Sequence, residues 1–419
     1  MGGRLLSVLL LLPVLGLAAC AVSQPQDRIE DRLRANDTAG ALEAAERLDS
    51  RRNQALYRLE RGMLLRFDGD LQGSVDEFEQ AKTLLGQLEP ISLSETVTDW
   101  AVAETADTYQ ASVHERLLLH VMQMLNFLEL GDVQAARVEA LQVDLGLRRV
   151  DPVDGAAPHG GDAFARYLSG IVFEGSGDRS DALIAYRRAA QRYQALNQPV
   201  PRDLQVSLLR LLDALGLPDE RDRWAETFGI TSWRPVAPDT GRLLLIVQSG
   251  LGPRLVEGTV ATQDPRTGQL YRISLPSVRR QGDPTTALRI TADDRQADGE
   301  RVESVHASVD RWLDARIPLL TARALSRNVV RHQVSAQARD EHAGLGVLVN
   351  LVGFLFEQAD TRLWRTLPDS LWMARLDLPA GEYEPEFRIS RRGGRDEAVQ
   401  PGAVTIEPGG LVVRTVTVR

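Results

Sequence analysis

A dense cluster of aromatic and charged residues near the C-terminus is the first candidate for chemistry. The stretch ADTRLWRTLPDSLWMARLDLPAGEY, residues 359–383, contains two Trp, three Arg, three Asp and two Leu-Pro pairs. It could form a catalytic site, a partner-binding face or a structural joint. No nucleophile or general base accompanies the cluster, so we expect a joint. Trp364 and Trp372 would wedge between a helix and a sheet, and Asp360 and Arg362 would pair or cap at a helix end.

Catalytic and metal-binding motifs do not stand out elsewhere in the chain. The six His residues show neither the i, i+4 spacing of a metal-binding helix nor a His-Glu-x-x-His pattern. A Gly-x-Ser-x-Gly elbow and a phosphate-binding Gly-x-x-x-x-Gly-Lys loop are also missing from the sequence. The 58 Asp and Glu make chance carboxylate pairs near-certain, so a glycan hydrolase stays open as an alternative. We expect no cofactor, no metal and no small-molecule ligand.

The N-terminus carries the most specific signal. Arg4 precedes an apolar run, LLSVLLLLPVLGL, that is too short to span a bilayer as a mature helix. Leu17-Ala18-Ala19-Cys20 follows and resembles the lipobox of bacterial lipoproteins. That resemblance implies cleavage before Cys20, acylation of this single Cys, and, because Ala21 follows, sorting to the outer membrane. The domain prediction is a signal peptide over residues 1–19 and a lipidated tether over residues 20–26.

Composition is that of an ordinary globular protein. The chain has 419 residues, of which 43% are hydrophobic and 26% charged, enough for two or three domains with cores of their own. The formal net charge of −9 does not suggest a nucleic-acid surface.

Residues 27–230 show helical periodicity in paired segments. Each pair is joined by a short turn with a Gly at position 69, 131 or 177 followed by Asp, whose side chain is expected to cap the second helix. The pairs resemble tetratricopeptide (TPR) repeats, with Gly62 or Gly170 allowing close helix approach. The spacing departs from the TPR period. Such an array typically presents a concave surface to a protein partner, and a purely packed scaffold is the alternative.

The second half favours strands. Turn residues over 231–241 indicate a linker, and short strand-length segments over 242–419 indicate a β-sandwich, interrupted by a helical insert at about 303–358. Within this insert, GLGVLVNLVGFLF is expected to be a buried helix, and a helix that touches lipid is the alternative. The predicted fold class is α+β: a TPR-like array followed by a sandwich.

The chain also resembles a family of proteobacterial TPR-containing outer-membrane lipoproteins. The match rests on a Gly-x-Gly-Pro turn at residues 250–253, an Arg-rich helix, TARALSRNVVRH, and an Asp-Thr-Arg-x-Trp-x-x-Leu-Pro signature. The signature residues are Asp360, Thr361, Arg362, Trp364, Leu367 and Pro368. The resemblance implies no established activity.

Together these features predict a lipid-anchored, periplasm-facing protein. We expect a non-enzymatic scaffold or adaptor that holds an envelope protein in cell-wall synthesis, envelope assembly or surface-polymer export. An envelope glycan hydrolase or a peptidoglycan-binding protein is the alternative.

Overall fold

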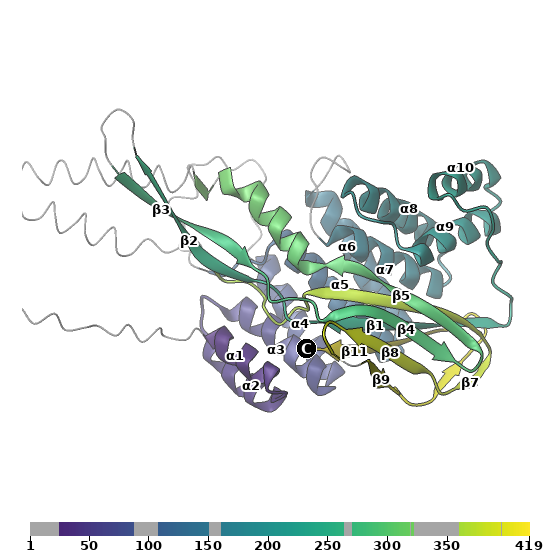
Figure 1. The fold of residues 1–419 in the computed structure, drawn as a ribbon, viewed down its shortest axis with the longest axis horizontal. Coiled ribbons are helices and arrows are strands. Elements are labelled where there is room, and N and C mark those ends of the chain that lie inside the picture. The colour runs from purple at the N-terminus through teal and green to yellow at the C-terminus, as the bar shows by residue number, and fades with distance from the viewer. Residues whose placement is uncertain are drawn as a thin grey trace, which may run out of the picture.

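The computed structural model describes residues 25–87, 108–150, 161–263, 270–318, 320–321, 360–394 and 396–419. Cys20, the apolar run at 344–356 and most of the Arg-rich helix lie outside these ranges. Within the described residues, helices fill the first half and strands the second, so the fold is α+β (Figure 1). None of the described helices is both long enough and apolar enough to span a membrane.

The first half is built from consecutive helices that pack in pairs. They are α1 (Pro25–Arg34), α2 (Thr38–Ala45), the short 3-10 helix η1 (Glu46–Leu48), α3 (Gln54–Asp68), α4 (Leu71–Gln87), α5 (Val113–Glu129), α6 (Val133–Val150), α7 (Asp162–Gly175), α8 (Arg179–Ala195), α9 (Arg202–Ala214) and α10 (Pro218–Phe228). The pairs α3–α4, α5–α6 and α7–α8 correspond to the three helix pairs predicted from the sequence.

The close approach of helices predicted at Gly62 and Gly170 is confirmed. A Cβ atom at Gly62 would overlap the ring of Phe78, and one at Gly170 would overlap the ring of Tyr186. Each Gly therefore lets the two helices of a pair approach until an aromatic ring fills the interface.

The predicted helix caps are confirmed at two turns. The side chains of Asp70 and Asp132 accept hydrogen bonds at 2.8 Å from the backbone N–H groups of Gly73 and Ala135. The prediction is wrong for Asp178, which makes no capping bond and pairs with Arg137 instead.

The second half contains one large mixed sheet. The strands are β1 (Thr240–Ser249), β2 (Arg254–Gln263), β3 (Leu270–Arg279), β4 (Thr285–Ala292), β5 (Arg295–Ser304), β6 (Ser370–Pro379), β7 (Gly381–Tyr383), β8 (Glu386–Arg391), β9 (Glu397–Val399), β10 (Val404–Ile406) and β11 (Leu411–Val418). Seven of them pair in the order β11-β1-β6-β5-β4-β8-β9. Only β1 and β11 run parallel within this sheet.

This arrangement corrects the predicted β-sandwich. The remaining strands form two small ribbons, β7–β10 and β2–β3, and the second projects from the body in Figure 1. One face of the main sheet packs on the helices: Leu244, Ile246 and Val413 belong to the same core as α5 and α7. The alternate residues Leu243 and Leu245 join a second core with the β7–β10 ribbon. Helices therefore occupy the place that a second full sheet would take.

The predicted linker and insert are only partly described by the structure. Helix α10 ends at Phe228 and β1 begins at Thr240, so residues 229–239 connect the helices to the sheet. A helix covers residues 305–318, within the predicted insert, and residues 322–359 lie outside the described ranges. The two halves share one core, so the structure does not divide into two separately packed bodies.

Candidate functional site

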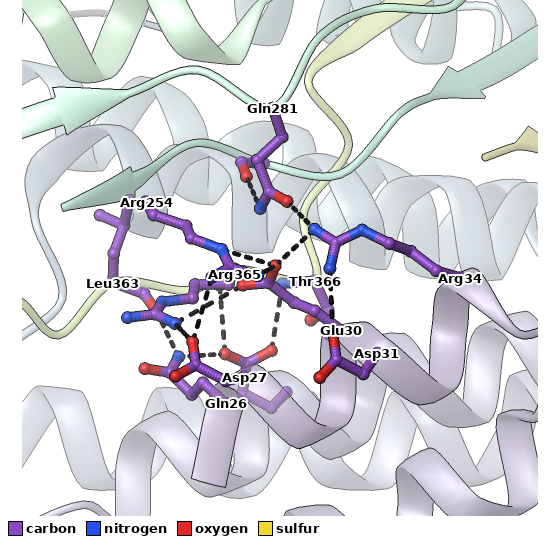
Figure 2. Close-up of polar contacts among 12 residues, drawn as sticks. Gln26, Asp27, Glu30, Asp31, Arg34, Arg254, Gln281, Leu363, Arg365 and Thr366 are labelled. Atoms are coloured by element: carbon purple, nitrogen blue, oxygen red, sulfur yellow. Dashed lines mark hydrogen bonds and ion pairs between the residues drawn. The ribbon is translucent and has the colours of Figure 1, made fainter. Parts of the chain in front are cut away.

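The signature, residues 360–368, forms a segment that lies against the helical array. Residues 363–366, called here the docked segment, connect the insert to β6 and contact α1, α3 and α5. Figure 2 shows Leu363, Arg365 and Thr366 beside Gln26 and Asp27 of α1. Trp364 is 1% exposed, and its ring meets that of Phe78 edge-on with centroids 5.7 Å apart. Its indole Nε1 donates to Thr366 Oγ1 at 3.0 Å. Trp364 was predicted to wedge between a helix and a sheet; its ring is buried and packs against Phe78 of α4, in the helical half.

Buried carboxylates hold the backbone of the docked segment. Glu115 Oε1 accepts from the backbone N–H of Trp364 at 2.7 Å, and the two oxygens of Glu60 accept from the N–H groups of Arg365 and Thr366, each at 3.1 Å. Gln26 Nε2 donates to the carbonyl of Leu363 at 2.6 Å. The array therefore binds main-chain groups that would otherwise be buried without partners.

Burial raises the pKa of Glu60, although its bonds to Thr366, Gln26 and the backbone of Arg365 counteract the shift. Glu60 and Glu115 are 0% and 2% exposed. Both carboxylates are thus engaged within the protein and closed to solvent, which suits a clamp and does not suit a general base acting on an external substrate.

Ion pairs fasten both the docked segment and the β2–β3 ribbon to α1. Arg365 Nη1 lies 2.9 Å from Asp27 Oδ1 and 3.6 Å from Glu30 Oε1. Glu30, whose side chain is 0% exposed, also pairs with Arg254 at the start of β2 and with Arg34 (Figure 2). These charges come from three distant parts of the chain, and Glu30 is the buried partner that Arg34, Arg254 and Arg365 share.

The signature residues on either side of the docked segment confirm the predicted pairing of Asp360 with Arg362 and add a contact that was not predicted. Asp360 Oδ2 pairs with Arg362 Nη2 at 2.7 Å, and Asp360 Oδ1 accepts from the Arg362 backbone N–H at 3.0 Å. Leu367 and Pro368 are buried, and Thr361 is half-buried. The carbonyl of Leu367 accepts from Gly252 N at 2.6 Å, where a Cβ would meet that oxygen at 2.9 Å. The Gly-x-Gly-Pro turn and the signature therefore meet in space, which the sequence did not predict.

Trp372 lies away from this site. Its indole Nε1 donates to Asp283 Oδ2 at 3.2 Å and to Ser370 Oγ at 3.0 Å. It packs against the core on the other face of the sheet. The prediction that both Trp residues wedge between a helix and a sheet is wrong. Trp364 precedes β6 and packs with the helices, whereas Trp372 lies on β6 and packs against the core on the opposite face of the sheet.

A groove lies between α4, α5 and α6, and we call it the α4–α6 groove. Its volume is about 640 Å³. Apolar lining comes from Leu85, Val113, Leu117, Leu119, Phe127, Ala135, Val138, Leu145 and Leu147, and polar lining from Glu79, Lys82, Arg116, His120, Glu139 and Gln142. The volume falls in the range of ligand sites, which are concave and mostly apolar.

The polar floor of the groove is an ion cluster around Glu139. His120 Nδ1 and Lys82 Nζ each lie 2.7 Å from a Glu139 oxygen, and Lys82 also pairs with Glu79 at 2.5 Å. Burial opposes the ionisation of Glu139, but the His120 hydrogen bond and the Lys82 charge outweigh it and lower the pKa of this carboxyl.

No functional site was predicted from the sequence at this groove. The signal was present in α6, where Ala136, Ala140, Val143 and Leu147 are buried while Val138, Leu141 and Leu145 are exposed. When a helix is apolar on its outer face as well as on its packed face, the outer face is a candidate surface for a partner.

The described His residues do not gather into a metal site. His114 is buried and its pKa is lowered to about 4, chiefly by burial, so it is neutral at pH 7. His306 pairs with Asp310 at 3.1 Å. Among the described residues, no group of three or more His, Cys, Asp or Glu has the geometry for a metal ion.

Comparisons with known proteins give structural similarities at low identity. No family model matches the chain, and no curated protein matches it. The crystal structure of MamA is 14% identical over 48% of this chain and 91% of its own, with a TM-score of 0.32. The apo form of RapI is 7% identical over 49% of this chain and 51% of its own, with a TM-score of 0.36. BtubC from P. vanneervenii is 15% identical over 52% and 84%, with a TM-score of 0.32.

Proposed function

We propose that this protein is a lipid-anchored, non-enzymatic scaffold of the bacterial envelope. Its helices and sheet form one frame, and the frame holds an envelope protein through the α4–α6 groove. The acyl chains attached at Cys20 keep it on the periplasmic side of the outer membrane. Cell-wall synthesis, envelope assembly and surface-polymer export are the processes that such a scaffold would serve.

The observation that carries the proposal is the exposed apolar wall of the groove. Val138 and Leu145 are 52% and 48% exposed on a helix whose opposite side is fully packed. Fully burying such a side chain is worth about 1.5–3 kcal/mol, so covering the exposed half of each contributes about 1 kcal/mol. A partner that covers the groove would gain this energy.

The docked segment supports the choice of the groove over other surfaces of the array. Residues 363–366 already occupy a face lined by α1, α3 and α5, and their backbone groups are bonded there. A protein partner would have to displace a buried Trp and several hydrogen bonds to use that face. The α4–α6 groove requires no such displacement.

The anchor places the frame close to the membrane. Helix α1 begins at Pro25, five positions after Cys20, and a chain of five residues spans at most about 17 Å. Glu30 and Gln26 fix α1 to the rest of the protein through Arg254 and Glu60. The acylated protein would therefore stand with α1 near the lipid surface.

Affinity capture tests the scaffold role. A soluble form that lacks the first 20 residues is used to capture proteins from detergent-solubilised envelopes, in parallel with a Val138→Asp variant. Ile184→Asp is the matched control, because Ile184 is 43% exposed on α8 and is not part of the groove. We expect one stoichiometric protein with the wild type and with the control, and its loss with Val138→Asp.

Two outcomes would contradict parts of the proposal. One is equal capture by all three forms, which would exclude the α4–α6 groove as the binding face but leave the scaffold role. The other is turnover of labelled peptidoglycan by the purified protein without any bound partner, which would favour the hydrolase.

A further inference from the structure

The exposed apolar side chains of α6 at the α4–α6 groove have the spacing of a helix-packing surface. Val138 and Leu145, which line the groove, and Leu141, which lies outside its lining, are 52%, 48% and 37% exposed and occupy positions i, i+7 and i+3 of α6. Residues at this spacing form one line on a helix, here about 10 Å long at 1.5 Å per residue. A linear apolar ridge beside a groove is the shape that a second helix fills.

The charges of the groove are already paired with one another. Lys82 lies between Glu79 and Glu139, and His120 bonds to Glu139. Arg116 donates from Nε to the carbonyl of Ala111 at 3.2 Å. A strongly charged ligand would have to break these pairs, whereas an uncharged apolar face leaves them intact.

The backbone of the groove walls offers no edge for an extended peptide. All three walls are α-helices, whose N–H and C=O groups are bonded within each helix. Recognition by strand addition needs free main-chain donors and acceptors, which a helical wall lacks.

We propose that the α4–α6 groove binds an amphipathic helix of a partner protein through an uncharged apolar stripe. The stripe has residues at i, i+3 or i+4, and i+7, which interlock with Val138, Leu141 and Leu145. This inference rests on the proposed scaffold function and adds the secondary structure and the chemistry of the partner segment. Glu79 and Lys82 at the rim contact polar residues beside that stripe.

Site-specific photo-crosslinking in living cells tests the proposal on the full-length, membrane-bound protein. A photoreactive phenylalanine analogue replaces Leu145 in one strain and Ile184 in a control strain, and the cross-linked residues are mapped by mass spectrometry. We expect Leu145 to cross-link to one protein, at apolar residues three or four positions apart, and Ile184 to give no such product. In the Leu145 strain, Val138→Asp should lower the yield by about tenfold, the effect of losing roughly 1.4 kcal/mol of binding.

The remaining outcomes overturn the inference in distinguishable ways. Cross-links to lipid, to a second copy of this chain or to consecutive residues of an extended segment would exclude a partner helix. If the capture experiment still yields a partner, only the helix assignment fails, and the scaffold function stands. If Leu145 gives no product above Ile184 and no partner is captured, both fail. Because the mapping uses the unmutated groove apart from the probe, it does not depend on the folding of Val138→Asp.

Discussion

Trp364 is the residue on which the docked segment depends most. Its ring is buried against Phe78, and its backbone N–H is bonded to Glu115. The sequence predicted a joint with a bulky Trp here because no nucleophile or general base accompanies the cluster. It did not predict the helices that receive the ring, because nothing in the local pattern identifies Glu60 or Glu115 as buried carboxylates.

Replacing Trp364 by Ala should destabilise the protein by about 3–5 kcal/mol, the usual cost of truncating a buried aromatic ring. Urea unfolding followed by circular dichroism measures the change. Trp233→Ala is the control, since Trp233 is half-buried and should cost clearly less. Equal midpoints for Trp364→Ala and the wild type would show that the ring does not anchor the segment.

Glu303 gives a prediction for pH dependence. Its carboxyl is buried at the end of β5, and Ser308 Oγ donates to Glu303 Oε1 at 2.6 Å. Burial raises its pKa to about 7, against the bond from Ser308 and the charge of Arg311. The folded state therefore favours the protonated form. The resulting stability is fully present below pH 4.5 and is lost as pH rises through 7.

We expect Glu303→Gln to remove this dependence. The wild type should lose stability relative to the variant between pH 5 and pH 8, by an amount on the order of 3 kcal/mol. The measurement is the difference in unfolding free energy across this range. The difference cancels the contribution of His114, whose lowered pKa acts in the opposite direction. A constant difference would mean that Glu303 is ionised in the folded protein.

At the scale of elements, local sequence rules describe the helix pairs well. The Gly-Asp turns, the small residues at helix crossings and two of the three predicted caps all depend on residues close together in the chain. The sandwich prediction failed because sheet pairing is long-range. The continuous apolar run of β1 did carry a usable signal, since a strand buried on both faces needs a cover on each side.

Two helical glycines allow a matched test of the helix-pair packing. Gly170→Ala places a methyl group into the ring of Tyr186 and should cost about 1–3 kcal/mol. Gly146→Ala has open space around its new Cβ and should be neutral or stabilise by up to about 1 kcal/mol through helix propensity. Thermal melts of the two variants compare the effects. The packing model would be contradicted if both changes had the same sign and size.

At the scale of the whole molecule, the two halves are held together by residues that are distant in sequence from the segment that connects them. The bond from Gln26 to Leu363 spans 337 positions, and Arg66 of α3 donates to Thr415 of β11 at 2.9 Å. Sequence periodicity shows where helices give way to strands. It does not predict such contacts, because periodicity reports only the local secondary structure within each half. The linker predicted over residues 231–241 therefore did not anticipate the common core.

Cutting the connection between the halves tests this common core most directly. A specific protease site is inserted between Pro235 and Pro238, a stretch that is largely exposed and forms no helix or strand. After cleavage, the sample is examined by gel filtration and by differential scanning calorimetry. We predict that the two pieces elute together and unfold in a single transition, because the docked segment and the shared core hold them. Separate elution of the pieces, or two independent transitions, would contradict a single frame.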